Sequence, residues 1–421
     1  MEPKNVVAAQ QNLPDNLASR NFLPPTSRLW HLEPALGCVG CFMKTECGGW
    51  HDDGLDCFEA NCCGKTKTCQ YACVRSDNFL KVYRDTGGFS SFQKWELRQE
   101  VADWPEYIPV IQNKSSRRAL IHRPIIAVPT SKLLRWGNNG EKAYYSKQNF
   151  YDVFKLDSRT EVLAVSVEKD PALESFWKYR LVRDYARRLR MLGIQRAICP
   201  DFSTAVNVPR LDNLANRRRS LICAEEFSAA GISVVPFLLA THEFDWLFWL
   251  SFLKEHSEIN TVAKEFQTGA SRKTIGEWHA QWLLRLEQEL GRGLHLIAVG
   301  GRRLIPLLSK MRGLTILDST PFMKAMKRRR LMIKNHQWSL CRTPRGEPID
   351  ELLAHNTCIY EQYVLQRIKT AREKGGRPSR APQNDQREPT SLMVTAQPGR
   401  PQLSLPFEST RSHLINTSAA G

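Results

Sequence analysis

Residues 193–238 carry the sequence GIQRAICPDFSTAVNVPRLDNLANRRRSLICAEEFSAAGISVVPFL, which indicates the fold class more clearly than any other part of the chain. The apolar segments at 196–199 and 233–238 have the length of buried strands, and the segment 211–230 between them has the length of a helix. Gly231 follows that segment, at the position where a glycine commonly ends a helix. A strand, a helix and a second strand in this order predict parallel strands joined by a right-handed crossover.

The same alternation continues on both sides of this segment. Further apolar segments of strand length lie at 124–128, 162–167, 261–266, 294–299 and 314–317. Helix-length segments lie between them, as at 172–192, 245–256 and 275–290. Seven strands, or eight with one near 81–90, predict an α/β fold of the closed (β/α)8, TIM-like barrel type. An open doubly wound sheet is the alternative, although no Gly-rich dinucleotide-binding turn follows the first strands.

The chain divides by composition into four parts. Residues 1–35 form a flexible leader, 36–80 a cysteine-rich module, 81–371 the expected barrel, and 372–421 a basic tail rich in Gly, Pro, Ser and Gln. With 421 residues, 42% of them hydrophobic and 24% charged, the sequence excludes wholesale disorder. The tail alone has a composition typical of disorder.

The sequence predicts neither secretion nor a membrane span. Residues 1–30 contain acidic residues and lack the apolar core of a signal peptide. The most apolar window, 231–253, is interrupted by His242, Glu243 and Asp245, and a strand followed by a helix explains it better. We therefore expect a cytoplasmic protein without a membrane partner.

The positive charge of the chain is concentrated in one segment. The whole sequence has 60 Lys and Arg against 43 Asp and Glu, a formal charge of +17. Between Arg302 and Arg345 there are twelve basic residues and a single acidic one, Asp318. A basic segment of this density predicts a nucleic-acid partner, DNA or RNA. A solvated basic helix face is the alternative, but the run at 327–330 is flanked by apolar residues, which indicates a folded element.

Eight of the twelve cysteines lie close together near the N-terminus. They are spaced as Cys38-x2-Cys41-x5-Cys47-x9-Cys57-x4-Cys62-Cys63-x5-Cys69-x3-Cys73. In a chain without a secretion signal, this density favours metal binding over a disulfide-stapled module, which is the alternative. Four thiolates hold one Zn2+ or one [4Fe–4S] cluster. The spacing decides neither the metal nor which cysteines group together.

Acidic residues follow several of the predicted strands. Glu168 follows 162–167, Asp201 follows 196–199, Glu265 lies at the end of 261–266, and Asp318 follows 314–317. In a barrel the chemistry belongs to the C-terminal ends of the strands, so these carboxylates are candidates for acid–base or nucleophilic roles. The alternative is that individual carboxylates cap the helices that follow them.

Two resemblances to known families appear in this sequence. Pro200-Asp201-Phe202-Ser203-x5-Pro209, followed by Asn216, Arg219 and Gly231-Ile232-x3-Pro236, resembles a bacterial and phage family known only as a domain of unknown function. This likeness covers about 40 residues and implies no activity.

The second resemblance, to the tRNA-guanine transglycosylase superfamily and its DNA-acting 7-deazaguanine relatives, spans about 275 residues. Four segments are similar to that family's motifs in the family's order: Asp85-Thr86-Gly87-Gly88-Phe89-Ser90, Val299-Gly300-Gly301-Arg302-Arg303-Leu304, Leu317-Asp318-Ser319-x-Pro321 with Lys324-Ala325, and His355-Asn356-x3-Tyr360. Its C-terminal zinc site, Cys-x-Cys-x2-Cys with a His, is absent from this sequence. Phe237-Leu238-Leu239 also stands where the family has Gln-Gly-Gly.

This second resemblance implies the exchange of a guanine-type base on DNA or RNA, on a nucleotide that has left its stack. It implies Asp318 as the nucleophile at C1′ of the sugar and Asp85 as the general acid and base. The residues that bind the base, the sugar or the phosphates would be Asp201, Glu265, Gly300, Gly301, Arg302, Arg303, Lys327, Arg328, Arg329 and Arg330.

Other functions compete with base exchange. The main alternative is a non-catalytic, metal-containing nucleic-acid-binding protein of a mobile element or phage, built on an inert barrel. The two hypotheses differ at Asp318, whose change to Asn abolishes exchange only if the carboxylate is catalytic. A metal-dependent hydrolase ranks last, because the ten histidines form no ligand pair four residues apart. The sequence leaves the oligomeric state undetermined.

Overall fold

The structure is a computed structural model. It describes residues 36–41, 43–49, 57, 67, 69, 71–73, 76–88, 94–112, 117–134, 144–206, 208–268, 272–334, 337–343 and 346–374. All of these residues belong to one compact unit, Met1–Arg377. The expected leader at 1–35 and almost all of the expected tail at 372–421 lie outside the described residues.

Two four-stranded parallel sheets form the centre of the fold. The first contains β2 (Ile125–Pro129), β3 (Glu161–Val165), β4 (Arg196–Ile198) and β5 (Ser233–Val235) in chain order. The second has the order β1-β8-β7-β6, with β1 (Tyr107–Pro109), β6 (Thr261–Phe266), β7 (His295–Gly300) and β8 (Gly313–Asp318). Each pairing within these sheets is parallel, so the predicted α/β class is confirmed.

Backbone contacts also link the two sheets at both of their ends. A parallel bridge joins Val110, just after β1, to Ala127 in β2, and a second bridge joins Phe237, just after β5, to Ala263 in β6. The amide of Ile111 donates to the Ala127 carbonyl at 2.8 Å. The amide of Leu238 donates to the Ala263 carbonyl at 2.9 Å.

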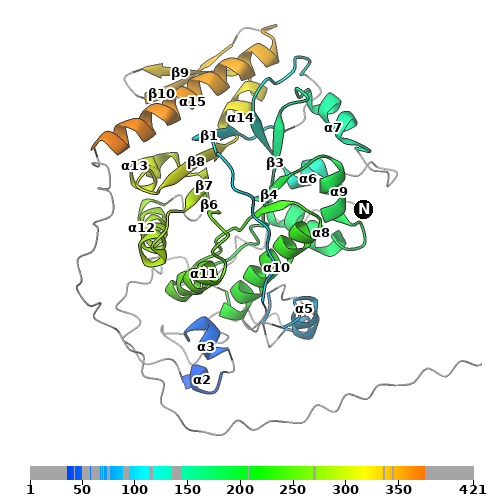
Figure 1. Ribbon diagram of the computed structural model, residues 1–421, viewed down its shortest axis with the longest axis vertical. Coiled ribbons are helices and arrows are strands. Elements are labelled where there is room, and N and C mark those ends of the chain that lie inside the picture. The colour runs from blue at the N-terminus through cyan, green and yellow to red at the C-terminus, as the bar shows by residue number, and fades with distance from the viewer. Residues whose placement is uncertain are drawn as a thin grey trace, which may run out of the picture. The chain divides into compact units, whose positions relative to one another are not determined.

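Helices follow most of the strands, as the alternation of the sequence predicts (Figure 1). They are α6 (Thr130–Leu133), α7 (Lys147–Phe154), α8 (Asp170–Tyr179), α9 (Tyr185–Met191), α10 (Arg210–Ala229), α11 (Glu243–Glu255), α12 (Lys273–Leu290), α13 (Ile305–Leu308), α14 (Thr320–Met326) and α15 (Ile349–Lys374). An antiparallel hairpin of β9 (Arg329–Lys334) and β10 (Gln337–Arg342) lies between α14 and α15 in the chain. Figure 1 shows this hairpin beside α15.

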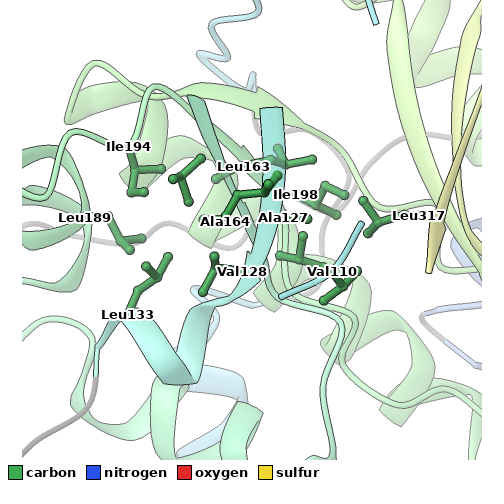
Figure 2. Close-up of a cluster of buried hydrophobic side chains, with 14 of the residues drawn as sticks. Val110, Ala127, Val128, Leu133, Leu163, Ala164, Leu189, Ile194, Ile198 and Leu317 are labelled. Carbon is green, nitrogen blue, oxygen red and sulfur yellow. The ribbon is translucent and has the colours of Figure 1, made fainter. Parts of the chain in front are cut away.

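The hydrophobic core joins side chains from both sheets. Because neighbouring residues of a strand point to opposite faces, Ala127, Leu163 and Ile198 lie on one face of the first sheet. They belong to the same hydrophobic cluster as Val110, just after β1, and Leu317 of β8. Figure 2 shows that group on one side of the strands. On the other side of the strands, Figure 2 shows the residues that pack against helices: Val128, Leu133, Ala164, Leu189 and Ile194.

The expected strand near 81–90 is wrong, because its first residues form helix α5 (Phe79–Asp85). Phe79 and Val82 are three residues apart, which places them on one helical face, and both pack on the cluster that includes Leu211 of α10. The first strand of the second sheet is instead β1, whose three residues are too few to give a periodic signal. No helix in the part of the chain that the structure describes is long and apolar enough to cross a membrane.

Candidate functional site

Carboxylates follow four of the parallel strands at their C-terminal ends. They are Glu168 after β3, Asp201 after β4, Glu265 at the end of β6, and Asp318 at the end of β8. Since the strands within each sheet run in one direction, these ends lie at the same edge of their sheet. The structure gives the four carboxylates different environments, and two of them, Asp201 and Glu265, interact electrostatically with the buried Lys264.

Asp201, half-buried just after β4, and Lys264, buried within β6, interact electrostatically. Burial, together with the charges of Glu265 and Asp170, raises the pKa of Asp201 to about 8, although the charge of Lys264 lowers it. Lys264 is 6% exposed, and burial lowers the pKa of its amine although Asp201 and Glu265 favour the charged form. A carboxyl group that keeps its proton near neutral pH is a candidate general acid.

The Lys264 side chain is held in place by the end of β5. Its ammonium group donates to the Leu238 carbonyl at 3.1 Å and lies 5.8 Å from the centre of the Trp246 ring. Leu238 lies three residues after the last residue of β5, so a backbone carbonyl and an aromatic face fix the amine in a site of low polarity.

Glu265 is held differently from Asp201. Its Oε1 accepts hydrogen bonds from the amides of Gln267 at 2.6 Å and Thr268 at 2.5 Å, and its Oε2 accepts one from the Thr268 hydroxyl at 3.1 Å. Three hydrogen bonds therefore fix the position of this carboxyl group. A carboxyl group with a raised pKa and a second one fixed by hydrogen bonds, both near strand ends, are candidates for acid–base and nucleophilic roles.

Glu168 stabilises the turn that leaves β2. It accepts a hydrogen bond from the Ser131 amide at 2.7 Å and a second from the Ser131 hydroxyl. Thr130 and Ser166 bond through their hydroxyl groups beside it, at 2.8 Å. Burial raises the pKa of Glu168 while the Ser131 donors oppose this. Glu168 therefore bonds to α6, the helix after β2, and not to α8, the helix that follows it in the chain, so it is not the expected cap.

Asp318 faces the helix layer behind β8. It lies on the same side of its strand as Ile316, whose register partner Tyr107 packs with its ring 5.5 Å from that of Tyr360 in α15. The Tyr360 hydroxyl donates to Asp318 Oδ2, and the Thr320 amide donates to Oδ1 at 2.7 Å. Both carboxylate oxygens are thus occupied, and the residue connects β8, α14 and α15.

Asp85 and Asp318 are not brought together. Asp85 is the exposed last residue of α5, and the following turn is held by Arg218 of α10, whose Nε donates to the Thr86 carbonyl at 2.5 Å. Gly87 and Gly88 have φ values of 63° and 87°, so this segment is a turn of the kind that glycines form. Figure 1 shows α5 beside α10, well away from β8 and α15. Phe89 and Ser90 lie outside the described residues.

The two glycines after β7 serve close packing. Gly300 and Gly301 have φ values of 77° and 75°, a region that other residues adopt only with strain. A Cβ at Gly300 would lie 2.5 Å from the Gln267 side chain, and one at Gly301 would lie 3.2 Å from that of Phe266. The glycines therefore let the end of β7 approach the end of β6, beside Glu265.

The basic residues of this region lie on several elements. Arg302 stacks with its guanidinium carbon 4.4 Å from the Trp338 ring in β10, while Arg303 and Lys327 are exposed. Arg328 is exposed at a left-handed φ of 50° and donates to the Glu347 carbonyl at 2.8 Å. Arg330 pairs with the Glu347 side chain. Arg329 begins β9, so the run 327–330 lies at the end of α14 and the start of a strand.

The His355-Asn356 pair of α15 binds the hairpin. Asn356 is fully buried; its side-chain oxygen accepts from the Leu331 amide and its side-chain nitrogen donates to the Arg329 carbonyl, both at 2.8 Å. His355 lies 3.0 Å from the Leu331 carbonyl through Nε2. An Asn inside a helix is uncommon and indicates that its side chain bonds to the backbone. The sequence does not show that the partner is strand β9.

The cysteine-rich module rests against α10. Cys38, Cys47, Cys69 and Cys73 are buried, Cys41 and Cys57 are half-buried, and Cys62 and Cys63 lie outside the described residues. The Ala72 amide donates to Asp212 of α10 at 2.7 Å. Within the described ranges, no group of three or more His, Cys, Asp or Glu side chains is already arranged to hold a metal ion.

Sequence reasoning missed a group of buried charges on α10 and α11. Asp245 accepts hydrogen bonds from Arg210 and Arg217, and all three side chains are buried. The signal was the number of Arg, Asp and Asn residues in 210–219, which is unusual for a helix that covers a sheet. Comparison with known proteins adds no further assignment: no protein-family model and no curated protein matches this chain.

Proposed function

We propose first that the two sheets are the two halves of one closed (β/α)8 barrel. The support is the pair of bridges, Val110 to Ala127 and Phe237 to Ala263, which would complete the order β1 to β8 and back to β1. In a closed barrel the C-terminal ends of β4, β6, β7 and β8 surround one mouth. Asp201, Glu265 and the two glycines would then belong to a single site.

We propose that this site breaks and forms N-glycosidic bonds of a nucleic acid, in the exchange of a guanine-type base. The observation that carries the proposal is a pair of carboxyl groups in different surroundings: Asp201 has a raised pKa and interacts electrostatically with Lys264, and Glu265 accepts three hydrogen bonds. Glycosidic chemistry uses such a pair, one group as the acid and the other as the carboxylate at the anomeric carbon.

In the proposed reaction Asp201 gives its proton to the leaving base as the bond between that base and C1′ breaks. The Glu265 carboxylate forms a bond to C1′, and Lys264 stabilises the Asp201 carboxylate that results. The incoming base loses its proton to Asp201 and displaces Glu265, so both side chains return to their starting states. These roles replace those implied for Asp85 and Asp318, which the fold keeps apart.

The nucleic-acid substrate is supported by charge. The segment between Arg302 and Arg345 carries twelve basic residues against one acid, and Arg303, Lys327 and Arg328 are exposed. Arg302 follows β7, the strand next to β6 and Glu265. Phosphate contacts of this kind position a strand without reading its sequence.

The test is the incorporation of radiolabelled guanine into DNA and into RNA, with Asp201→Asn and Glu265→Gln as variants. We expect each variant to lose at least about 100-fold in exchange rate while strand binding stays near that of the unaltered protein. Asp152→Asn, an exposed carboxylate on α7, is the matched control. Full exchange activity in the Asp201 and Glu265 variants would contradict the assignment, and strand binding without any exchange would favour the non-catalytic binding protein.

A further inference from the structure

The hairpin of β9 and β10 has two different faces. Side chains that are opposite each other in an antiparallel pair lie on the same face, and the register pairs Leu331 with Leu340 and Ile333 with Trp338. All four side chains belong to, or pack against, the hydrophobic cluster that contains Tyr360 of α15. This apolar face therefore packs against the rest of the protein, and Figure 1 shows α15 beside the hairpin.

The other face of the hairpin takes no part in the hydrophobic core. It carries the register pairs Arg330 with Cys341 and Met332 with Ser339. Ser339 is exposed and the other three residues are half-buried. Among the residues that the structure describes, none of the four belongs to a hydrophobic cluster. We call these four residues the free face of the hairpin.

The hairpin carries a strong positive charge. Residues 327–342 contain six Lys and Arg and no Asp or Glu. Arg329 and Arg342 are directly opposite each other in the register, where two like charges destabilise a pair of strands. In the described part of the chain, the one carboxylate that forms an ion pair with this group of arginines is that of Glu347, with Arg330. The open end of the hairpin therefore has an excess of positive charge, which a polyanion would compensate.

The shape of the hairpin favours one kind of polyanion. Its strands have six residues each, a length of about 20 Å. The major groove of B-form DNA is about 12 Å wide and admits a two-stranded ribbon, whereas the major groove of A-form RNA is too narrow for side chains to read. Single strands bind to aromatic side chains on which their bases stack, but the free face has none and Trp338 lies on the opposite face. Double-stranded DNA is therefore the best match.

The hairpin is also connected to the strand ends that carry the candidate site. The guanidinium carbon of Arg302 lies 4.4 Å from the centre of the Trp338 ring. Arg302 begins the short helix after β7, and β7 is the neighbour of β6, which carries Glu265. A DNA duplex bound by the hairpin would thus be held beside β7.

We propose that the free face of the β9–β10 hairpin enters the major groove of double-stranded DNA. Met332 and Ser339 would contact base edges there, since an apolar side chain suits the thymine methyl group and a hydroxyl bonds to either kind of base pair. Arg329 and Arg342, at the open end, would bind phosphates beside the groove. The inference deepens the proposed function and rests on it for the reaction, because it names the duplex as the nucleic acid whose base is exchanged.

The first test compares the affinity of the full chain for three fluorescent probes of one sequence: a DNA duplex, a DNA single strand and an RNA duplex. We expect the DNA duplex to bind at least about 10-fold tighter than the other two at the same salt concentration. Equal or tighter binding of the single strand or of the RNA duplex would overturn the proposal, and so would the absence of binding to all three probes.

The second test measures how the affinity for the DNA duplex depends on salt. Arg342→Gln removes one proposed phosphate contact, so we expect the slope of log Kd against log salt concentration to decrease by about 1. Arg187→Gln removes the same charge from an exposed position of α9, which Figure 1 shows away from the hairpin, and serves as the matched control. An unchanged slope in Arg342→Gln, or the same decrease in both variants, would contradict the assignment.

The third test needs no variant and so does not depend on the folding of one. Methyl green occupies the major groove of duplex DNA, and netropsin occupies the minor groove. We expect methyl green to displace the unaltered protein from the DNA duplex and netropsin to leave the complex intact. Displacement by netropsin alone would place the protein in the minor groove and overturn the proposal.

These outcomes are distinguishable from those of the base-exchange test. Asp201→Asn is expected to lose exchange and to keep its affinity for the DNA duplex. Major-groove binding without any exchange in the unaltered protein would overturn the proposed reaction and leave the assignment of the hairpin in place. Exchange on RNA, or on DNA that the hairpin variants bind with unchanged salt dependence, would overturn the assignment of the hairpin and leave the reaction in place.

Discussion

Tyr360 and Asp318 form the most direct contact between α15 and β8. The Tyr360 hydroxyl is buried and donates to the Asp318 carboxylate, and burial together with that negative charge raises the pKa of Tyr360. The second carboxylate oxygen receives the Thr320 amide at the start of α14. A carboxylate with these partners stabilises the packing of a helix on a strand.

Tyr360→Phe is therefore expected to destabilise the protein by about 2 kcal/mol, the usual contribution of a hydrogen bond to a charged group. The free energy of unfolding in urea gives the measurement. Tyr363→Phe is the matched control, because its hydroxyl accepts from Arg367 at a more accessible position of the same helix. Base exchange should continue at an unchanged rate in Tyr360→Phe, and a large loss of exchange would return Asp318 to the reacting centre.

Asp201 makes stability depend on pH. Its pKa of about 8 lies well above that of an unfolded Asp, so between about pH 4 and pH 8 the folded state holds a proton that the unfolded state has released. The contribution of Asp201 to the free energy of unfolding is largest below that pH range and decreases as the pH rises through it. Lys264, whose pKa is lowered, contributes in the opposite direction at higher pH.

Asp201→Asn removes the titrating group, so the stability of the variant relative to the unaltered protein should increase from pH 5 to pH 8. Urea unfolding at the two pH values measures this difference, and Asp152→Asn, an exposed acid, should show no such change. A constant difference across the range would mean that Asp201 is ionised throughout and is unsuited to act as an acid.

The sequence placed Asp201 and Glu265 correctly at strand ends, because the strand–helix alternation fixes where each strand stops. It did not reveal Lys264, since a lysine inside an apolar strand gives no sign of its partners. The side of β8 on which Asp318 lies depends on Tyr107 and Tyr360, which are far from it in sequence. The segment at Asp85 is similar to the family's motif because both have the sequence of a turn. Turn sequences of this kind occur in proteins that share no function.

At the scale of elements, α10 and α11 are joined by a buried ion pair. Burial alone would raise the pKa of Asp245, but Arg210 and Arg217 hold it well below its usual range. The carboxylate also accepts the Thr241 amide at 3.0 Å, which fixes the start of α11. The N-terminal turns of two helices thus depend on a single side chain.

Asp245→Asn removes the carboxylate that Arg210 and Arg217 share, and we expect it to destabilise the fold by about 3–5 kcal/mol. Glu255→Gln, at the exposed end of the same helix, should change stability by less than about 0.5 kcal/mol. Thermal unfolding followed by circular dichroism compares the two. A small effect of Asp245→Asn would contradict the assignment and would mean that other groups compensate the charge of the two arginines.

The long elements were predictable and the short ones were not. Helices α10 and α12 have 20 and 18 residues, long enough for composition and glycine positions to mark their ends. Strands β1 and β4 have three residues each, and β1 follows a segment that the sequence does not distinguish from a loop. For β4 the flanking helices and Gly193 supplied the signal that the strand itself lacks.

At the scale of the whole molecule, the pairing of the edges of the two sheets decides whether the barrel is closed. An open parallel sheet leaves the amides of its edge strands free to exchange with solvent, whereas a closed barrel has no such edge. The amides of Ile111 and Leu238 occupy the two junctions and bond to Ala127 and Ala263. Their protection reports on closure directly, because neither amide has another role in the fold.

We expect the amides of Ile111 and Leu238 to exchange as slowly as that of Ile316, which lies inside the second sheet and bonds to Glu106 at 2.9 Å. Residue-resolved hydrogen–deuterium exchange of the full chain measures all three, with the 92% exposed Val101 as the reference for rapid exchange. If Ile111 or Leu238 exchanges like Val101, the sheets open at that junction. Asp201 after β4 and Glu265 in β6 would then lose the fixed separation that the proposed chemistry needs. The junction at Leu238 matters more than the one at Ile111, because it joins β5 to β6 beside Lys264.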